Sequence, residues 1–251
     1  MSLTVIILTA SLAVTLLWRY ILGPFVIWRK GRIQPVVTFD TLEAHELPSK
    51  ILQVFESQVT ALKHEGFSLV AYLRKSDRVT TFLALMANHD SGDVAVLIDI
   101  TAGAGAESVH TSSVEFGTEY TDGLEILTNS SSQVSVFRKT RARLVFKFPE
   151  VRDPRALYAI HRRLLAAHRS RSNVVLAVEG GEIQELARSI ERDVARQESH
   201  GYYYLDPVAA VYRPTFKGAV LMTWRVAWPG SVIRRALEQR ASAAALKRTF
   251  N

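Results

Sequence analysis

The sequence predicts an α+β protein with an N-terminal transmembrane helix, an antiparallel β-meander flanked by helices, and a basic helical C-terminal segment. An apolar run opens the chain, short alternating segments separated by turn residues fill its middle, and helical periodicity recurs on either side of them. We expect three parts. Residues 1–33 form the anchor and its basic flank, residues 34–172 an α+β antiparallel-sheet domain, and residues 173–251 a mostly helical segment with a basic tail.

The apolar run covers residues 3–28 and is interrupted only by Arg19. A helix needs about 20 mostly apolar residues to cross the hydrocarbon core of a bilayer. No Lys or Arg precedes the run, and the residues around Arg19 are too bulky for a signal-peptide cleavage site. We therefore predict an uncleaved single-pass anchor that Gly23 and Pro24 kink or end. The alternative is a buried N-terminal core helix, but such a helix rarely lacks a polar face.

Positive charge follows the run rather than preceding it, which places the N-terminus outside and the following domain in the cytoplasm, at the cell membrane. Tryptophans at the end of the run suit the aromatic belt of a membrane interface. The C-terminal tail is also basic and contains tryptophan, a composition typical of helices at anionic membrane surfaces. The residues that we predict to contact lipid are Trp18, Arg19, Trp28, Arg29, Lys30, Arg32, Trp224, Trp228, Arg234 and Arg235.

After a linker that contains Pro35, a short helical turn is expected within residues 41–47 and an amphipathic helix over residues 49–65, with Gly66 ending it. Strands then follow in hairpin order, and Asp122-Gly123 marks one of the turns. The expected strands are residues 67–74, 79–89, 94–101, 109–120, 124–128, 134–138 and 143–148. A helix from Asp153-Pro154 to about residue 168 completes this domain.

The C-terminal segment is expected to start with a strand at residues 173–178 and a charged amphipathic helix at residues 182–200. Residues 202–205 and 209–213 suit a strand pair. Two further helices are expected at residues 216–226 and 231–249. The basic C-terminal helices either touch the inner leaflet or form a packed helical hairpin with a solvated basic face.

The formal net charge of +7 conceals a segregation of charge, because residues 79–137 contain no Lys or Arg. Four acids of that stretch fall on the second predicted hairpin, and they are Glu115, Glu119, Asp122 and Glu125. We predict that this acidic hairpin is a partner-binding surface. The other interpretations are a solvated hairpin face, or carboxylates for acid–base chemistry or a hard cation.

No motif in the sequence specifies catalysis, and we expect no cofactor and no metal. The chain has no cysteine, so disulfides, thiol catalysis and Cys-ligated metals are excluded. The glycines of residues 102–106 lack the Lys-Ser/Thr of a phosphate loop, which favours a flexible connection. His161 and His168 could share a helix face, but a zinc site usually needs a third ligand, and their neighbours are basic.

These features favour a membrane-anchored interaction or scaffolding protein whose partners are the lipid bilayer, possible anionic headgroups and an unknown protein. One alternative is an enzyme or small-ligand binder with a site assembled from scattered residues. A second alternative is a membrane-tethered nucleic-acid binder, but the candidate recognition helix over residues 182–200 carries acids that would repel phosphates.

Overall fold

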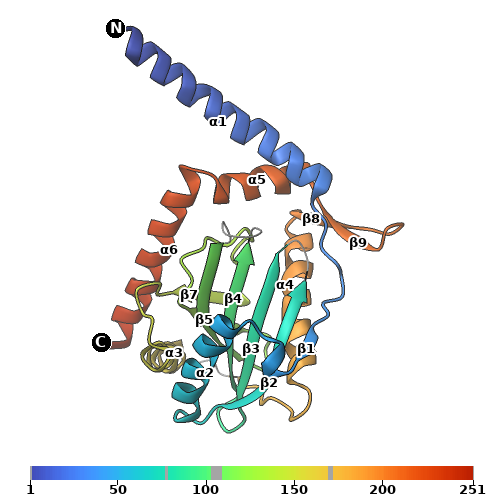
Figure 1. The fold of residues 1–251 in the computed structure, drawn as a ribbon, viewed down its shortest axis with the longest axis vertical. Helices are drawn as coiled ribbons and strands as arrows, with labels where there is room; N and C mark the ends of the chain where they lie inside the picture. The colour runs from blue at the N-terminus through green and yellow to red at the C-terminus, as the bar shows by residue number, and fades with distance from the viewer. Residues whose placement is uncertain (1, 77–78, 103–108, 169–171, 251) are drawn as a thin grey trace. The chain divides into compact units, whose positions relative to one another are not determined.

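The computed structural model describes residues 2–76, 79–102, 109–168 and 172–250 (Figure 1). The chain forms two compact units, each assembled from several stretches of sequence. Unit 1 comprises Met1–Val37, Gln133–Arg138 and Arg188–Ala236, and unit 2 comprises Thr38–Ser132, Lys139–Ala187 and Leu237–Asn251. The domain boundaries given above stay a prediction, and the two units are described separately.

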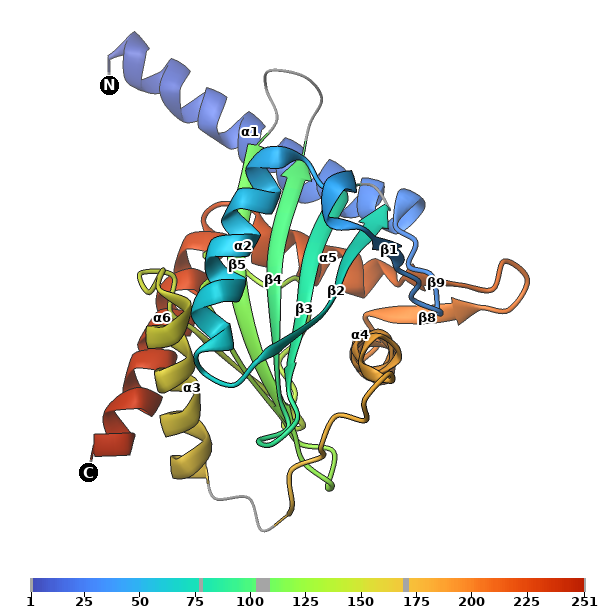
Figure 2. The same ribbon diagram turned by 60° about the horizontal axis from the view of Figure 1, so that its bottom comes forward.

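A seven-stranded sheet is the centre of unit 2, with its strands in sequence order from β1 to β7 (Figures 1 and 2). The strands are β1 (Asp40–Leu42), β2 (Ser68–Ser76), β3 (Thr80–Asn88), β4 (Asp93–Ala102), β5 (Val109–Glu119), β6 (Glu125–Asn129) and β7 (Arg143–Lys147). Neighbours from β1 to β6 are antiparallel, which confirms most of the predicted meander. Gly92 and Gly123 adopt φ angles of 73° and 80° in the β3–β4 and β5–β6 turns, where L side chains are disfavoured.

Helices α2 (Ser49–Lys63) and α3 (Pro154–His168) pack on one face of this sheet. Their apolar side chains recur every three or four residues, so one stripe of each helix reaches the core. Phe55 of α2 and Leu157 of α3 are fully buried there with Phe116 of β5. Helix α2 ends at Lys63, two residues before the predicted end, and Gly66 follows with a φ of 87° in the turn that leaves the helix.

The opposite face of the sheet is also covered in part. Ile183 and Leu186, from the first turns of α4 (Glu182–Ser199), pack against Leu73, Leu85 and Val96. Unit 2 is therefore a mixed α+β structure with apolar contacts on both faces of the sheet.

Three of the expected strands are corrected by the structure. Residues 134–138 form no strand, and β7 pairs with β6 in parallel rather than antiparallel orientation. The connection over residues 130–142 returns the chain to the start of β6, so β7 runs in the same direction. Residues 173–178 also form no full strand, since only Val174 makes a bridge, to Tyr120. The predicted flexible connection covers residues 102–106. Of these, only Ala102 belongs to the described residues, and the others lie outside them.

Unit 1 contains the N-terminal helix α1 (Leu3–Lys30), the strand pair β8 (Tyr203–Asp206) and β9 (Val211–Pro214), and α5 (Phe216–Val226). Helix α1 continues through Pro24, so of the two predicted outcomes, a kink or an end at that residue, the end does not occur. The prolyl ring is buried, and Gly23 allows α1 to approach Thr223 of α5, because a Cβ at Gly23 would lie 3.1 Å from Thr223 Cγ2. Helices α4 and α6 (Gly230–Lys247) each have residues in both units.

Within the described parts of the chain, no helix meets the length and hydropathy that a membrane crossing requires. The structure therefore gives no support to the predicted N-terminal transmembrane helix. Five side chains of the apolar run, at positions 3, 10, 12, 13 and 16, lie outside the described residues.

Candidate functional site

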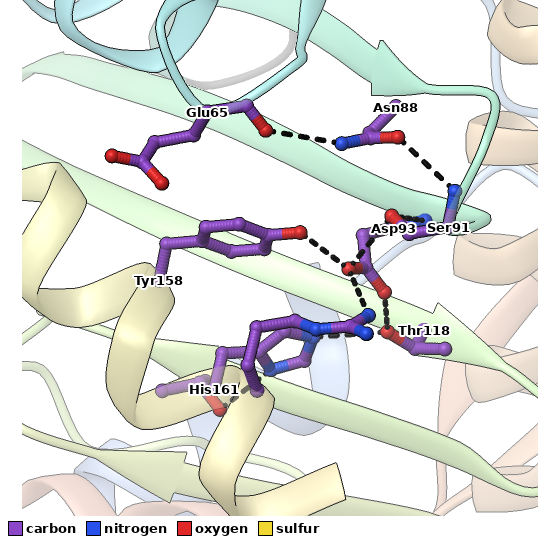
Figure 3. A network of polar contacts seen from close by, with 9 residues as sticks. Glu65, Asn88, Ser91, Asp93, Thr118, Tyr158 and His161 are labelled. Carbon is purple, nitrogen blue, oxygen red and sulfur yellow. Dashed lines mark hydrogen bonds and ion pairs between the residues drawn. The ribbon is translucent and has the colours of Figure 1, made fainter.

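A buried carboxylate, Asp93 at the start of β4, is the centre of a polar network in unit 2 (Figure 3). Its Oδ1 accepts a hydrogen bond of 2.5 Å from the Thr118 hydroxyl. Its Oδ2 accepts bonds from the hydroxyls of Ser91 at 2.9 Å and Tyr158 at 2.8 Å. Arg162 Nη1 donates to the same oxygen at 2.8 Å. Both carboxylate oxygens are therefore bound by protein groups, as a buried charge requires.

The β3–β4 turn supplies the upper part of this network. Asn88 ends β3, and its amide oxygen accepts the Ser91 backbone N–H at 3.1 Å. Its amide nitrogen donates to the Glu65 carbonyl oxygen at the end of α2, also at 3.1 Å. Asn88 thus ties the end of α2 to the turn that positions Ser91 beside Asp93 (Figure 3).

Helix α3 supplies the other side of the network from residues three and four apart, Tyr158, His161 and Arg162. This spacing places the side chains on one helix face, toward the sheet. His161 is fully buried and is in contact with two threonine hydroxyls, Thr118 Oγ1 at Nε2 and Thr128 Oγ1 at Nδ1, each at 2.9 Å. Arg162 lies at the border of the network, with about half of its side chain exposed.

The direction of the hydrogen bonds assigns the tautomer of His161. The single hydroxyl hydrogen of Thr118 goes to Asp93, so His161 Nε2 must donate its hydrogen to Thr118 Oγ1. A neutral ring then accepts at Nδ1, where the Thr128 hydroxyl donates. A chain of donors therefore runs from Thr128 through His161 and Thr118 to Asp93.

Burial sets the protonation of both rings in the network. Desolvation lowers the pKa of His161 to about 4, although the negative charge of Asp93 opposes this shift. Desolvation and the charge of Asp93 raise the pKa of Tyr158 to about 12. Both groups are therefore neutral near pH 7, and the charge of Asp93 is balanced by Arg162.

The network is closed to substrates in the arrangement described, because each oxygen of Asp93 already accepts from the protein. Its chemical effect is to hold α3 against β4, β5 and β6 by polar contacts. Sequence analysis missed Asp93, Thr118 and Tyr158 as members of a common site. The available signal was a threonine among apolar inward positions of β5, and a histidine on the apolar face of α3.

The structure separates the two histidines that the sequence suggested as a pair. His161 is buried with both ring nitrogens in contact with threonine hydroxyls, whereas His168 is exposed in the last turn of α3. In the described ranges, no group of three His, Cys, Asp or Glu side chains could hold a metal ion.

The four residues of the acidic hairpin differ in their surroundings. Asp122 is exposed in the β5–β6 turn, where its carboxylate accepts the Leu124 N–H at 3.1 Å. Glu115 and Glu119 are partly buried, and Glu115 accepts from the Asn129 amide at 2.9 Å. Glu125 is buried and forms an ion pair of 2.7 Å with Arg143. Partner binding by this hairpin stays a prediction, to which Glu125 contributes no solvated charge.

All ten residues predicted to contact lipid belong to unit 1. The four tryptophans, Trp18 and Trp28 of α1, Trp224 of α5 and Trp228 just after it, are exposed. The rings of Tyr20 and Trp224 lie 5.8 Å apart, and those of Trp28 and Phe216 lie 6.0 Å apart. The Tyr20 hydroxyl also donates to the Trp228 carbonyl oxygen at 2.9 Å. Helices α1 and α5 thus bring the two predicted lipid-contacting regions together, from opposite ends of the sequence.

The basic members of this set lie in the C-terminal half of α1, directly after α1, or in the first turns of α6. Arg19, Arg29, Lys30, Arg32 and Arg235 are exposed, and Arg234 is partly buried. The Arg29 guanidinium lies 5.1 Å from the centre of the Trp28 ring, which is within cation–π range. The C-terminal end of α1 therefore combines positive charge with aromatic side chains.

The part of α1 before Tyr20 has apolar side chains exposed on all sides, including Ile7, Leu8, Val14 and Leu17, each about 60% exposed. Figures 1 and 2 both show this part of α1 continuing past the end of α5. The hydroxyls of Thr9 and Thr15 donate to the backbone carbonyls four residues earlier, at 2.6 and 2.8 Å. Polar side chains bonded in this way are compatible with an apolar solvent.

No family model, curated protein or solved structure matches this chain. Its function therefore has to be inferred from the chemistry of its own residues.

Proposed function

We propose that this chain is a membrane-attached interaction protein, in which α1 inserts into the bilayer and unit 2 serves as the interaction domain. The observation that carries the proposal is the exposure of large apolar side chains along α1, from Val5 to Trp28, among the side chains that the structure describes. A helix in water normally has a polar face, and an extensive apolar surface of this kind indicates a site of contact with lipid or protein.

The residues around Tyr20 favour lipid over a protein partner. Aromatic and cationic side chains gather in the C-terminal part of α1, from Trp18 to Lys30, as at a membrane–water interface. The residues before Tyr20 number 17 in the helix, which gives about 25 Å of length at 1.5 Å per residue. That length is close to the thickness of a hydrocarbon core, about 30 Å.

A cysteine-labelling experiment tests this proposal and the orientation at the cell membrane. The natural chain contains no cysteine, so the single substitutions Ser2→Cys and Val208→Cys each create one reactive site on the full-length protein. Both positions are exposed. We expect a membrane-impermeant maleimide to label position 2 in intact cells and position 208 only after lysis. Labelling of both positions in intact cells, or of neither, would contradict the single-pass arrangement with a cytoplasmic domain.

We further propose that the exposed end of the acidic hairpin takes part in binding a protein partner. Glu119 and Asp122 are the members to replace, because neutralising buried Glu125 would disturb its pair with Arg143. Cross-linking followed by mass spectrometry should detect one stoichiometric partner of the full chain. The double substitution Glu119→Gln and Asp122→Asn should weaken its recovery, whereas Glu56→Gln on the exposed side of α2 should not. Equal recovery with all three chains would remove the acidic hairpin from the proposal.

A further inference from the structure

Helix α5 has an apolar surface on its exposed side. Phe216, Val220 and Trp224 follow one another at four-residue spacing and are between 40% and 57% exposed. We call these three residues, together with Trp228, the α5 stripe. The other side of α5 is already packed, with Ala219, Met222 and Thr223 buried. Helix α5 therefore has apolar side chains on both sides, which is unlike a helix at an ordinary water-exposed surface.

The α5 stripe is continuous with the aromatic end of α1. Phe216 is in ring contact with Trp28, Trp224 is in ring contact with Tyr20, and the Trp228 carbonyl accepts the Tyr20 hydroxyl. A close approach supports this packing, because a Cβ at Gly23 of α1 would lie 3.1 Å from Thr223 Cγ2 of α5. Since α1 and α5 pack at their aromatic residues, a bilayer that contains the aromatic end of α1 in its interface reaches the α5 stripe as well.

Charge favours an anionic surface as the occupant of this stripe. No Asp or Glu occurs in α1, and none occurs from residue 207 to residue 237. Lys217 and Arg235 are exposed beside the stripe or just after it. Arg225 instead points inward, where it donates to the Phe137 carbonyl and lies over the Tyr202 ring. Exposed cations beside exposed aromatic side chains match the charge and polarity of anionic lipid headgroups.

We infer that α5 lies in the headgroup layer of an anionic bilayer and forms a second membrane contact beside the α1 anchor. This inference rests on the proposed membrane attachment and names the lipid class that the same surface binds. It limits the part of α1 that enters the hydrocarbon core to the residues before Tyr20. The α5 stripe is the surface of the inference, and Lys217 and Arg235 are its charge-selecting residues.

Depth-dependent quenching of a fluorophore tests the inference on the full-length protein. Single cysteines at Val220, Val14 and Val208 carry an environment-sensitive nitrobenzoxadiazole label, and the protein is reconstituted into vesicles of equal parts phosphatidylglycerol and phosphatidylcholine. Nitroxide lipids quench the label either near the headgroup or deep in the acyl chains. We expect the label at position 220 to be quenched more strongly by the shallow nitroxide, and the label at position 14 by the deep one. Position 208, at the exposed β8–β9 turn, should respond to neither.

The outcomes separate this inference from the proposed function. Deep quenching at position 14 with water-like emission at position 220 overturns the α5 contact and leaves the anchor standing. Shallow quenching at position 220 with water-like emission at position 14 supports the α5 contact and overturns the anchor. A label at position 220 that is shielded from water without lipid quenching indicates a second copy of the chain on the stripe, and it also overturns the inference.

A charge-reversed chain tests the choice of lipid. Lys217→Glu and Arg235→Glu replace two exposed side chains, so the fold should be retained. We expect the shallow quenching at position 220 to fall at least twofold in this background, and to fall similarly for the unsubstituted chain in pure phosphatidylcholine. Quenching that is unchanged in both cases would overturn the preference for anionic lipid.

Discussion

The hydroxyl of Tyr20 donates a hydrogen bond of 2.9 Å to the backbone carbonyl oxygen of Trp228, 208 residues later in the chain. This bond joins α1 to the loop between α5 and α6, two residues after the end of α5. It fixes the relationship on which both membrane proposals depend, because it places the two aromatic regions of the sequence in one surface of unit 1.

Replacing Tyr20 with phenylalanine removes that bond and retains the ring contact with Trp224. A typical hydrogen bond contributes about 1 kcal/mol to stability. For a chain of this size, we expect the midpoint of thermal unfolding in detergent to fall by about 2–4 °C. The control is Tyr204→Phe at an exposed tyrosine of β8, which should change the midpoint by less than about 1 °C. Equal midpoints for both variants would show that the Tyr20 bond does not stabilise unit 1.

Replacing Asp93 with asparagine should destabilise unit 2 more than any exposed acid would. The Thr118 hydroxyl donates to one oxygen of Asp93, and the Ser91 and Tyr158 hydroxyls donate to the other. An amide keeps only one accepting oxygen, so one of these two sets of hydroxyls loses its acceptor. We expect a loss of about 2–3 kcal/mol in the free energy of unfolding, because Arg162 can turn to water but the buried hydroxyls cannot. Chemical denaturation measures this loss. The matched change Asp122→Asn, in the exposed turn, should cost less than about 0.5 kcal/mol, and equal losses would contradict the description of the network.

The stability of the protein should fall in acid because of His161. Burial lowers the pKa of its imidazole to about 4 from an ordinary value of 6.5, so the unfolded chain binds more protons between these values. Stability is therefore lost as the pH falls from about 6.5 to about 4, by roughly 3 kcal/mol in total. Nitrogen NMR of a histidine-labelled chain should show a neutral Nε2–H tautomer at pH 6. A ring that gains its second proton near pH 6.5 would contradict the assigned proton chain.

The ion pair between Glu125 and Arg143 should show a coupling energy that surface pairs lack. The side chains of both partners are largely buried. Glu119, a second acid, is the residue paired with Glu125 across the β5–β6 hairpin. We expect Arg143→Met to cost more than Glu125→Gln, since only the first leaves a buried carboxylate without that guanidinium. A double-mutant cycle on unfolding free energies should give about 1–3 kcal/mol of coupling. Additive losses would place this pair among ordinary surface pairs.

The local elements were predictable from the sequence because their signals are local. Helix α2 carries its apolar stripe and its terminal glycine within 18 residues, and both confirmed hairpins contain a turn glycine. The parallel pairing of β7 was not predictable in the same way. It depends on the course of residues 130–142, which contain no periodic pattern that would distinguish a return crossover from another hairpin.

The Asp93 network was beyond sequence reasoning because its members are far apart in the chain. Arg162 follows Asp93 by 69 residues, and Tyr158 follows it by 65. The acidic hairpin shows the same limitation, because its face was predictable but its partner on another strand was not. Strand alternation correctly puts Glu115, Glu119 and Glu125 on one face, but it contains no information about Arg143, which joins that face from a strand added later.

Alkaline extraction of membranes that contain the full-length protein tests membrane attachment most directly. We predict that the unsubstituted chain stays in the membrane pellet at high pH, and that a chain with Leu8→Glu and Val14→Glu is released. Both side chains are exposed, so these changes disturb no packed core, and Val208→Glu in the exposed β8–β9 turn should leave the protein in the pellet. Complete release of the unsubstituted chain into the supernatant would contradict insertion of α1 into the bilayer.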